Sequence, residues 1–249
     1  MTDRAAAARK ALAAMDLTRL EEEDDDREVR ALCRRADTPF GHPAAVCVYP
    51  AFVDAARRTL AEVGLSDRVA VATVANFPGG AAEPARAAAE TRRALSLSAD
   101  EVDVVFPWRA LLDGDETIGA RLVEQCRAAC GRGVLKVILE SGMLAAPDAI
   151  RRAADVAIGA GADFVKTSTG KADAGATPDA AEVMLEAIRD SGTDCGFKVS
   201  GGVRTLDDAI AYMALAERVL GPGCIEPDRF RIGASGLLTA LLETLDADG

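Results

Sequence analysis

Eight short apolar segments recur along the chain at intervals of roughly 30 residues, the spacing of a β-strand followed by a crossover helix. The predicted strands are 13–17, 44–48, 69–75, 101–106, 134–140, 163–167, 196–200 and 230–233. Eight such units predict an α/β fold, a closed (β/α)8 TIM barrel, with a short helix before the first strand. We expect the whole chain, residues 1–249, to form this single domain.

Stretches rich in Ala, Leu and Arg lie between these segments and show helical periodicity. Examples are 27–36, 83–96, 177–190 and 206–220. Thr177, which precedes a proline, and Thr205, which precedes an acidic turn, are predicted N-caps. An open doubly wound sheet is the alternative. It would usually carry a glycine-rich nucleotide-binding loop after its first strand, and residues 16–26 (DLTRLEEEDDD) contain none.

Charge and hydropathy exclude several classes of partner. The net charge of −11 argues against nucleic acid or an anionic membrane. No run of about 18 apolar residues is present, and the first residues lack the apolar core of a signal peptide. We therefore expect a cytoplasmic protein. A homo-oligomer is compatible with the sequence, which leaves the oligomeric state open.

The six cysteines are scattered without a CxxC pair, which favours reduced thiols over disulfides. Cys126 and Cys130 are four residues apart on a predicted helix. Because His42 is the only histidine, packed thiols are a better interpretation of this pair than a metal site.

Lysine is rare in this chain, with five lysines against 24 arginines. Four of the five, Lys136, Lys166, Lys171 and Lys198, lie in predicted strands or in the loops that follow them. Arginine stays protonated, whereas burial or a nearby cation can make a lysine amine neutral, so that it can attack a carbonyl and form a Schiff base. The placement of the lysines therefore predicts covalent amine catalysis.

Strand alternation places several charged side chains on one face. One consistent register points Asp103, Lys136, Lys166 and Lys198 into the barrel, and Asp16 can join them. Buried charge is unfavourable unless it is paired. A purely structural ion-pair network is one interpretation, but three inward lysines in a lysine-poor chain favour catalysis.

Three loops after the last predicted strands are rich in glycine: STGK (168–171), SGGVR (200–204) and GASG (233–236). Glycine lets backbone N–H groups approach an anion, and the N-terminus of a following helix adds partial positive charge. Lys171 and Arg204 can add full charges. These loops favour a phosphorylated small molecule as the ligand, at the position where TIM barrels usually bind phosphate.

Long strings of residues resemble the deoxyribose-phosphate aldolase family of class I aldolases. They are MDLT (15–18), AAVCVYP (44–50), ATVANFP (72–78), ADEVDVVFP (99–107), GADFVKTSTGK (161–171), GFKVSGGVRT (196–205) and RIGAS (231–235). The resemblance implies a (β/α)8 barrel that reversibly cleaves 2-deoxy-D-ribose 5-phosphate to D-glyceraldehyde 3-phosphate and acetaldehyde, without metal or cofactor. It also implies that Lys166 forms the Schiff base, that Lys198 is its neighbouring lysine, and that Asp103 is the acidic partner in proton transfer.

A larger set of residues is predicted to contact the substrate. It comprises Asp16, Thr18, Cys47, Thr167, Thr169, Gly170, Lys171, Gly201, Gly202, Val203, Arg204, Gly233 and Ser235. Asp16 could equally be an N-cap at the end of the first strand, and the threonines could instead bind loop amides. Cys47 is by default a packed thiol, although the resemblance places an aldehyde-reactive cysteine there.

Two departures from the family are visible. Many members have Ser-Ser where this chain has Ser235-Gly236, and some end in a tail with a tyrosine that assists proton transfer, whereas this sequence ends in DADG (246–249). Both departures could weaken phosphate specificity or slow protonation without changing the reaction class.

Two other functions remain open. One is a different Schiff-base aldolase, such as a transaldolase-like or keto-acid aldolase, that acts on another phosphorylated sugar. The other is a sugar-phosphate-binding barrel without catalysis, in which the lysines only pair with Asp103 and Glu140.

Overall fold

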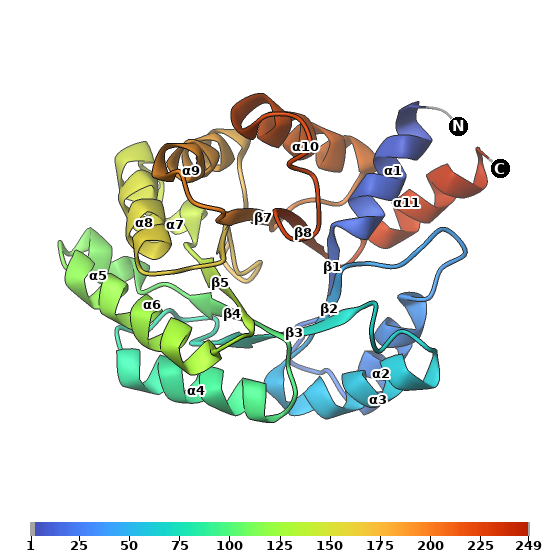
Figure 1. The fold of residues 1–249 in the computed structure, drawn as a ribbon, viewed down its shortest axis with the longest axis horizontal. Helices are drawn as coiled ribbons and strands as arrows, with labels where there is room; N and C mark the ends of the chain where they lie inside the picture. The colour runs from blue at the N-terminus through green and yellow to red at the C-terminus, as the bar shows by residue number, and fades with distance from the viewer. Residues whose placement is uncertain (1–2, 249) are drawn as a thin grey trace.

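The structure, a computed structural model, describes residues 3–248 and is a closed barrel of eight parallel strands (Figure 1). Each strand pairs with the next, and the last pairs with the first. The strands are β1 (Met15–Thr18), β2 (Ala45–Cys47), β3 (Ala70–Ala75), β4 (Glu101–Val105), β5 (Val134–Ile138), β6 (Phe164–Lys166), β7 (Gly196–Ser200) and β8 (Phe230–Ala234). The predicted TIM barrel is confirmed.

Helices cover the outside of the barrel (Figure 1). They are α1 (Asp3–Ala13), α2 (Asp26–Arg35), η1 (Pro50–Phe52), α3 (Val53–Glu62), α4 (Pro84–Ser96), α5 (Trp108–Leu112), α6 (Glu116–Cys130), α7 (Ser141–Leu144), α8 (Pro147–Gly159), α9 (Pro178–Ser191), α10 (Leu206–Leu220) and α11 (Leu237–Asp246). The short helix predicted before the first strand is α1, which packs beside α11.

Local sequence signals account for several element ends. Thr177 caps α9 and Thr205 caps α10, each by accepting a backbone N–H, so both predicted N-caps are confirmed. Asp25 caps α2 in the same way and belongs to the acidic run EEEDDD (21–26). The fifth strand was predicted to reach residue 140 but ends at Ile138. The reason is that Glu140 has a left-handed backbone conformation (φ 57°, ψ 55°), which lies outside the extended region of regular strands.

Two apolar clusters fill the molecule. The large one lies between strands and helices and includes the outward-facing Leu135 and Val137 of β5. The small one consists of Leu20, Ala45, Cys47, Ala72 and Val74 and lines the β2–β3 side of the barrel interior. The other strands contribute charged side chains to the same interior. The barrel core is therefore apolar on one side and ionic on the other.

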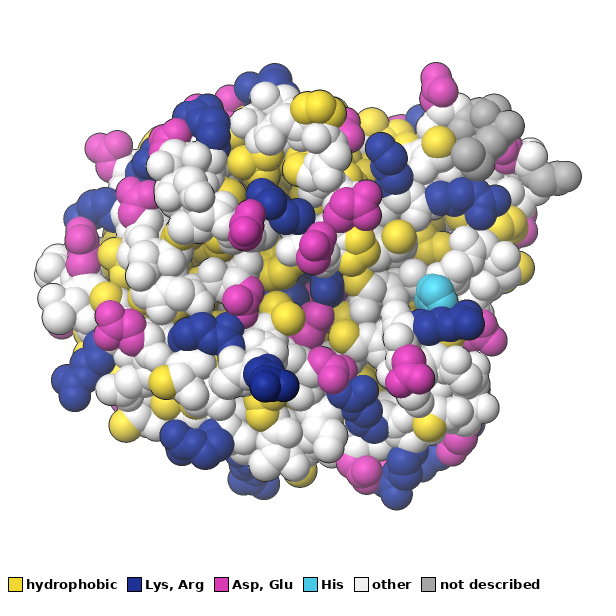
Figure 2. All heavy atoms as spheres, viewed as in Figure 1, with side chains coloured by type: hydrophobic (Ala, Val, Ile, Leu, Met, Phe, Trp, Pro, Cys, Tyr) yellow, Lys and Arg dark blue, Asp and Glu magenta, His cyan; other side chains and the backbone are white. Residues whose placement is uncertain are grey.

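The surface carries charges of both signs. Acidic and basic side chains are interspersed around the rim of the face in Figure 2, and ion pairs such as Arg151–Asp190 and Arg4–Asp207 join neighbouring helices. All six cysteines are buried, and none of them forms a disulfide. Within residues 3–248, no helix has both the length and the apolar character needed to cross a membrane.

Candidate active site

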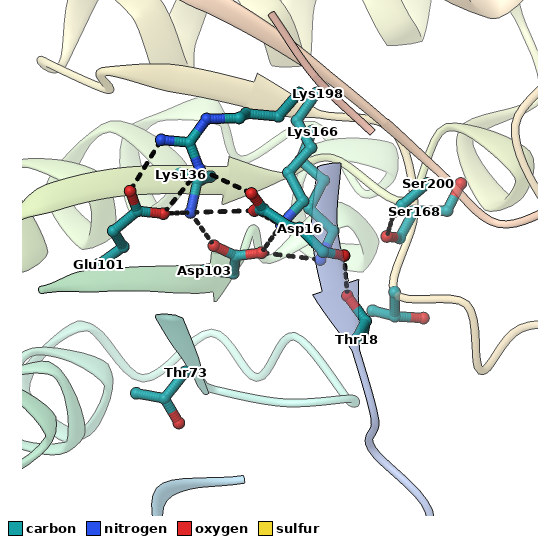
Figure 3. A network of polar contacts seen from close by, with 12 residues as sticks. Asp16, Thr18, Thr73, Glu101, Asp103, Lys136, Lys166, Ser168, Lys198 and Ser200 are labelled. Carbon is teal, nitrogen blue, oxygen red and sulfur yellow. Dashed lines mark hydrogen bonds and ion pairs between the residues drawn. The ribbon is translucent and has the colours of Figure 1, made fainter. Parts of the chain in front are cut away.

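Seven charged side chains meet inside the barrel, each at most 6% exposed (Figure 3). They are Asp16 of β1, Glu101 and Asp103 of β4, Lys136 of β5, Lys166 of β6, Lys198 of β7 and Arg231 of β8. Strand pairing sets Asp103 beside Lys136, and Lys166 beside Lys198. The inward face predicted for the three lysines and the two aspartates is what the structure shows.

Asp103 is the centre of this cluster. Its Oδ1 accepts a hydrogen bond from Lys136 Nζ over 3.0 Å. Its Oδ2 accepts from Lys198 Nζ over 2.7 Å and from Lys166 Nζ over 2.9 Å. The amines of Lys166 and Lys198 therefore flank one carboxylate oxygen (Figure 3).

The remaining contacts form what we call the inner ion network, made of Asp16, Glu101, Asp103, Lys136, Lys198 and Arg231. Lys136 binds Glu101 and lies 3.4 Å from Asp16 Oδ2, in addition to its bond with Asp103. Arg231 donates to Asp16 over 2.6 Å and to Glu101 over 2.9 Å, and Lys198 binds Asp16. Each member of this network thus has at least two partners of opposite charge.

Counting the charges in the barrel interior shows that one base is in excess. Four bases, Lys136, Lys166, Lys198 and Arg231, face three carboxylates, Asp16, Glu101 and Asp103. If every group were ionised, this buried cluster would hold an uncompensated positive charge, which is very unfavourable in a protein interior. One base should therefore be neutral.

Among the four bases, only Lys166 has a lowered pKa. Burial lowers the pKa of Lys166 and the Lys198 ammonium lowers it further, and together they outweigh the attraction of Asp103. Burial also disfavours the charged forms of Lys198 and Lys136. For these two lysines the attraction of the nearby carboxylates outweighs burial, so both pKa values are raised. The pKa values of Asp16 and Asp103 are lowered despite burial, because lysines surround them. Lys166 is thus the base closest to neutrality, as predicted.

A cavity of about 310 Å³ opens above Lys166. It lies at the carboxyl ends of the strands, since Thr18, Lys166, Ser200 and Ala234 each end a strand. Its lining contains most of the predicted contact residues, namely Thr18, Thr169, Gly170, Lys171, Gly201, Gly202, Val203, Arg204, Gly233 and Ser235. Leu20, Glu21, Ser200, Ala234 and Gly236 also line it.

The glycine loops give this cavity open backbone donors. Gly201 and Gly202 have φ values of 86° and 102°, which favour glycine. Among the hydrogen bonds that join residues 3–248, none uses the N–H of Gly201, Gly202, Val203 or Ser235 as donor. Gly236, the N-cap of α11, adds the positive end of that helix. The cavity is therefore suited to an anion.

Gly233 is needed for close packing. A Cβ at this position would lie 3.0 Å from Lys198 Cε and 3.0 Å from Ser200 Cβ, closer than ordinary contact. A side chain here would require Lys198 or Ser200 to shift by a few tenths of an ångström. The absence of a side chain at Gly233 thus leaves room for Lys198, and Gly233 also forms part of the glycine loop that lines the cavity.

Three predicted contact residues lie outside the cavity lining. Asp16 is inside β1 rather than an N-cap at its end, and Arg231 and Lys198 occupy its oxygens. Thr167 Oγ1 donates to the Ser200 carbonyl and accepts from the Ser200 N–H, so it joins β6 to β7. Cys47 is buried in the small apolar cluster, where burial raises the pKa of its thiol to about 11.

The sequence-based list of site residues omitted Arg231, Glu101 and Glu140. Strand alternation could have found Arg231, because it lies between the outward-facing Phe230 and Ile232 of β8. Glu140 was expected to pair with lysines in the non-catalytic alternative, and this is wrong. Its buried carboxylate accepts from the N–H (3.2 Å) and the hydroxyl of Thr169, which orients the loop after Lys166.

The loop after β6 contains a buried hydroxyl that forms no hydrogen bond with the described residues. Ser168 Oγ is buried and has no hydrogen-bond partner among the described residues. Within residues 3–248, no group of three or more His, Cys, Asp or Glu side chains is arranged to hold a metal ion.

Comparison with known proteins adds a family. The family model of the DeoC/LacD aldolases matches residues 10–241. A deoxyribose-phosphate aldolase from Aeropyrum pernix, described as a tetramer, superposes with a TM-score of 0.75 and 25% identity, over 99% of this chain and 98% of that one. A candidate deoxyribose-phosphate aldolase from Toxoplasma gondii ME49 superposes with a TM-score of 0.90 and 26% identity, over 98% of this chain and 96% of that one. Another candidate, from Coccidioides immitis, superposes with a TM-score of 0.83 and 29% identity, over 95% of this chain and 86% of that one.

Proposed function

The chain belongs to the DeoC/LacD family of aldolases, and we propose that it is a Schiff-base member that acts without a metal ion. The proposed reaction is the reversible cleavage of 2-deoxy-D-ribose 5-phosphate to D-glyceraldehyde 3-phosphate and acetaldehyde. The description of similar structures as deoxyribose-phosphate aldolases supports this substrate.

The observation that carries the proposal is the state of Lys166. It is the surplus base of a buried ionic cluster, its pKa is lowered, and it lies in the lining of the cavity. A neutral amine is the form that attacks a carbonyl, and burial and a neighbouring cation are the usual means of producing it. Lys171 also lines the cavity, but its amine is paired with a carboxylate near the surface.

The steps follow from this assignment. Lys166 Nζ attacks the C1 aldehyde carbon of the open-chain sugar, and water leaves to give an iminium ion. Loss of the proton from the C3 hydroxyl breaks the C2–C3 bond, and the bonding electrons move toward the iminium nitrogen, which releases glyceraldehyde 3-phosphate. The resulting enamine is protonated at C2, and hydrolysis frees acetaldehyde and the amine. The imine itself is the electron sink, so no metal ion is required.

Asp103 and Lys198 are the proposed proton carriers. Lys166 and Lys198 share Asp103 Oδ2, so a proton leaving one amine has a short path to the other. The raised pKa of Lys198 keeps it protonated as a donor, and Asp103 and Asp16 together stabilise that charge. General acid–base assistance of this kind typically contributes about 10²–10⁴-fold to a rate.

The glycine loops are proposed to bind the 5-phosphate. Gly201, Gly202 and Ser235, whose N–H groups are open, line the cavity together with Gly236 at the start of α11, and Lys171 and Arg204 add charge. Gly236 replaces the serine common in the family. This departure keeps open the alternative that another phosphorylated sugar is the natural substrate of the same Schiff-base chemistry.

Borohydride trapping tests the proposal directly. Incubation with acetaldehyde and borohydride should leave a stable N-ethyl group on Lys166, located by peptide mass mapping. Lys166→Arg should abolish the label. Lys10→Arg is the matched control, because the Lys10 side chain is 59% exposed on α1, and it should leave the label unchanged. Absence of a label, or a label on another lysine, would contradict the assignment.

A coupled assay for glyceraldehyde 3-phosphate release then distinguishes the two candidate substrates. Release from deoxyribose 5-phosphate supports the proposed reaction. Trapping at Lys166 without such release supports the alternative. The tetramer described for the Aeropyrum pernix protein supports a homo-oligomer here as well, and light scattering after gel filtration tests it.

A further inference from the structure

A carboxylate lines the cavity beside one of the cations proposed to bind the phosphate. Glu21, in the loop after β1, lines the cavity together with Lys171, in the loop after β6. Lys171 Nζ donates to Glu21 Oε2 over 2.9 Å, although 150 residues separate the two in sequence. If Lys171 binds the phosphate of the substrate, then Glu21 and that phosphate require the same ammonium group.

The backbone of Glu21 is held by a tight local turn. Its N–H donates to Asp24 Oδ2 over 2.8 Å, and its carbonyl accepts the Asp24 N–H over 3.2 Å. The Arg19 guanidinium binds the same Asp24 carboxylate. The turn therefore keeps the Glu21 side chain within reach of Lys171.

The ion pair is suited to being displaced. The side chains of Lys171 and Glu21 are 28% and 58% exposed, so water screens their attraction and the pair contributes little to stability. A phosphate dianion held by several N–H groups can replace the carboxylate. After displacement, the Glu21 charge remains near the cavity and repels the anion.

We propose that Glu21 is a specificity-determining residue that competes with phosphate for Lys171. It weakens the binding of phosphorylated ligands and does not affect the binding of unphosphorylated ones. The difference in affinity between the two kinds of ligand is therefore smaller than it would be without Glu21. This inference rests on the proposed function, because it assumes that the phosphate end of the substrate occupies the glycine loops.

The test uses two isosteric variants with the same change in net charge. Glu21→Gln removes the competing carboxylate. Glu23→Gln is the matched control, because Glu23 is exposed and belongs to the same acidic run. The measurements are the dissociation constant of inorganic phosphate by calorimetry, and the KM values of deoxyribose 5-phosphate and of unphosphorylated deoxyribose.

We expect Glu21→Gln to lower the phosphate dissociation constant and the KM of the phosphorylated sugar by about three- to tenfold. The KM of unphosphorylated deoxyribose should not change, and Glu23→Gln should resemble the wild type. In a Lys171→Met background the gain from Glu21→Gln should shrink, because the ammonium group is no longer contested.

Three results would overturn the inference. They are unchanged or weaker phosphate binding by Glu21→Gln, an equal gain from Glu23→Gln, and an undiminished gain in the Lys171→Met background. Failure of the proposed function looks different. In that case the wild type would not cleave deoxyribose 5-phosphate or would not be trapped at Lys166, while Glu21→Gln could still bind inorganic phosphate more tightly.

Discussion

Lys136 and Lys166 lie on neighbouring strands, are equally buried and bind the same aspartate, yet their pKa values shift in opposite directions. Lys136 has three carboxylates within reach, those of Asp16, Glu101 and Asp103. Lys166 has Asp103, whose Oδ2 it shares with Lys198. Burial alone does not decide whether a lysine is charged. The number of opposing charges around it does.

The same contrast separates two regions of the barrel interior. In the inner ion network each side chain has at least two partners of opposite charge. In the cavity above it, one amine is left over and backbone donors are open. We infer that the network is the support that makes Lys166 reactive, and that the cavity is where it acts. The following changes test that division.

The largest effect is expected for Lys166→Arg. Arginine retains the positive charge and much of the bulk but cannot become a neutral amine, so no imine can form. Cleavage should fall by about 10⁴-fold or more, since removing the nucleophile of a covalent enzyme has effects of several orders of magnitude. Steady-state rates measure the loss, and circular dichroism checks that the fold persists. Near-normal activity in a folded variant would assign the chemistry to another residue.

Asp103→Asn removes the charge that links the two regions. The amide can no longer accept protons from Lys166 and Lys198 as a carboxylate does, so turnover should fall by about 10²–10⁴-fold. Borohydride trapping should persist in part, because Lys166 remains. Comparison of trapping rate with turnover measures the effect. Equal losses in both would mean that Asp103 serves imine formation rather than the later proton transfers.

Lys136→Met tests the inner ion network. It removes from the interior the cation that binds Asp16, Glu101 and Asp103, which should lower the free energy of unfolding by about 3–5 kcal/mol. Arg151→Met on the surface is the control. The Arg151 side chain is 38% exposed, and the pair it forms with Asp190 is worth about 1 kcal/mol or less. Urea unfolding of the two variants makes the comparison. Similar losses would refute the distinction between the network and ordinary surface pairs.

Lys198→Leu should move the pH dependence of activity. Loss of this cation removes one group that lowers the pKa of Lys166, and it leaves the Asp103 charge to act more fully on the remaining amine. Both effects raise the pKa of Lys166. Because activity requires the neutral amine, the rate profile should shift to higher pH as well as fall in height. A lower profile at an unchanged pH position would limit Lys198 to proton transfer.

The smallest effect is expected for Gly236→Ser at the phosphate end. Gly236 has φ −88°, and nothing lies within 4 Å of an added Cβ, so serine fits without strain. Its hydroxyl adds one hydrogen bond to a charged group, which corresponds to about tenfold tighter binding. The KM of deoxyribose 5-phosphate should fall, and that of unphosphorylated deoxyribose should not. If both values move together, the phosphate lies elsewhere.

Much of the fold could be predicted from the sequence because local periodicity determines it. The predicted ends of β7 and α10 coincide with the observed ones, and both threonine N-caps are in place. The inward face of the lysines also follows from alternation, since successive side chains of a strand point to opposite sides. The fifth strand was predicted too long because Glu140 leaves the extended conformation to bind Thr169, which is 29 residues away.

The amino-acid sequence by itself thus determined the barrel, the inward lysines and the glycine loops. Tertiary structure decided which lysine has a lowered pKa, that Arg231 joins the ion network, that Thr167 joins two strands, and that Glu21 meets Lys171. Each of these depends on closing β8 against β1 and on the register between strands, which bring together groups up to 215 residues apart. Electrostatic shifts depend on distances between such groups, and residue order along the chain does not specify those distances.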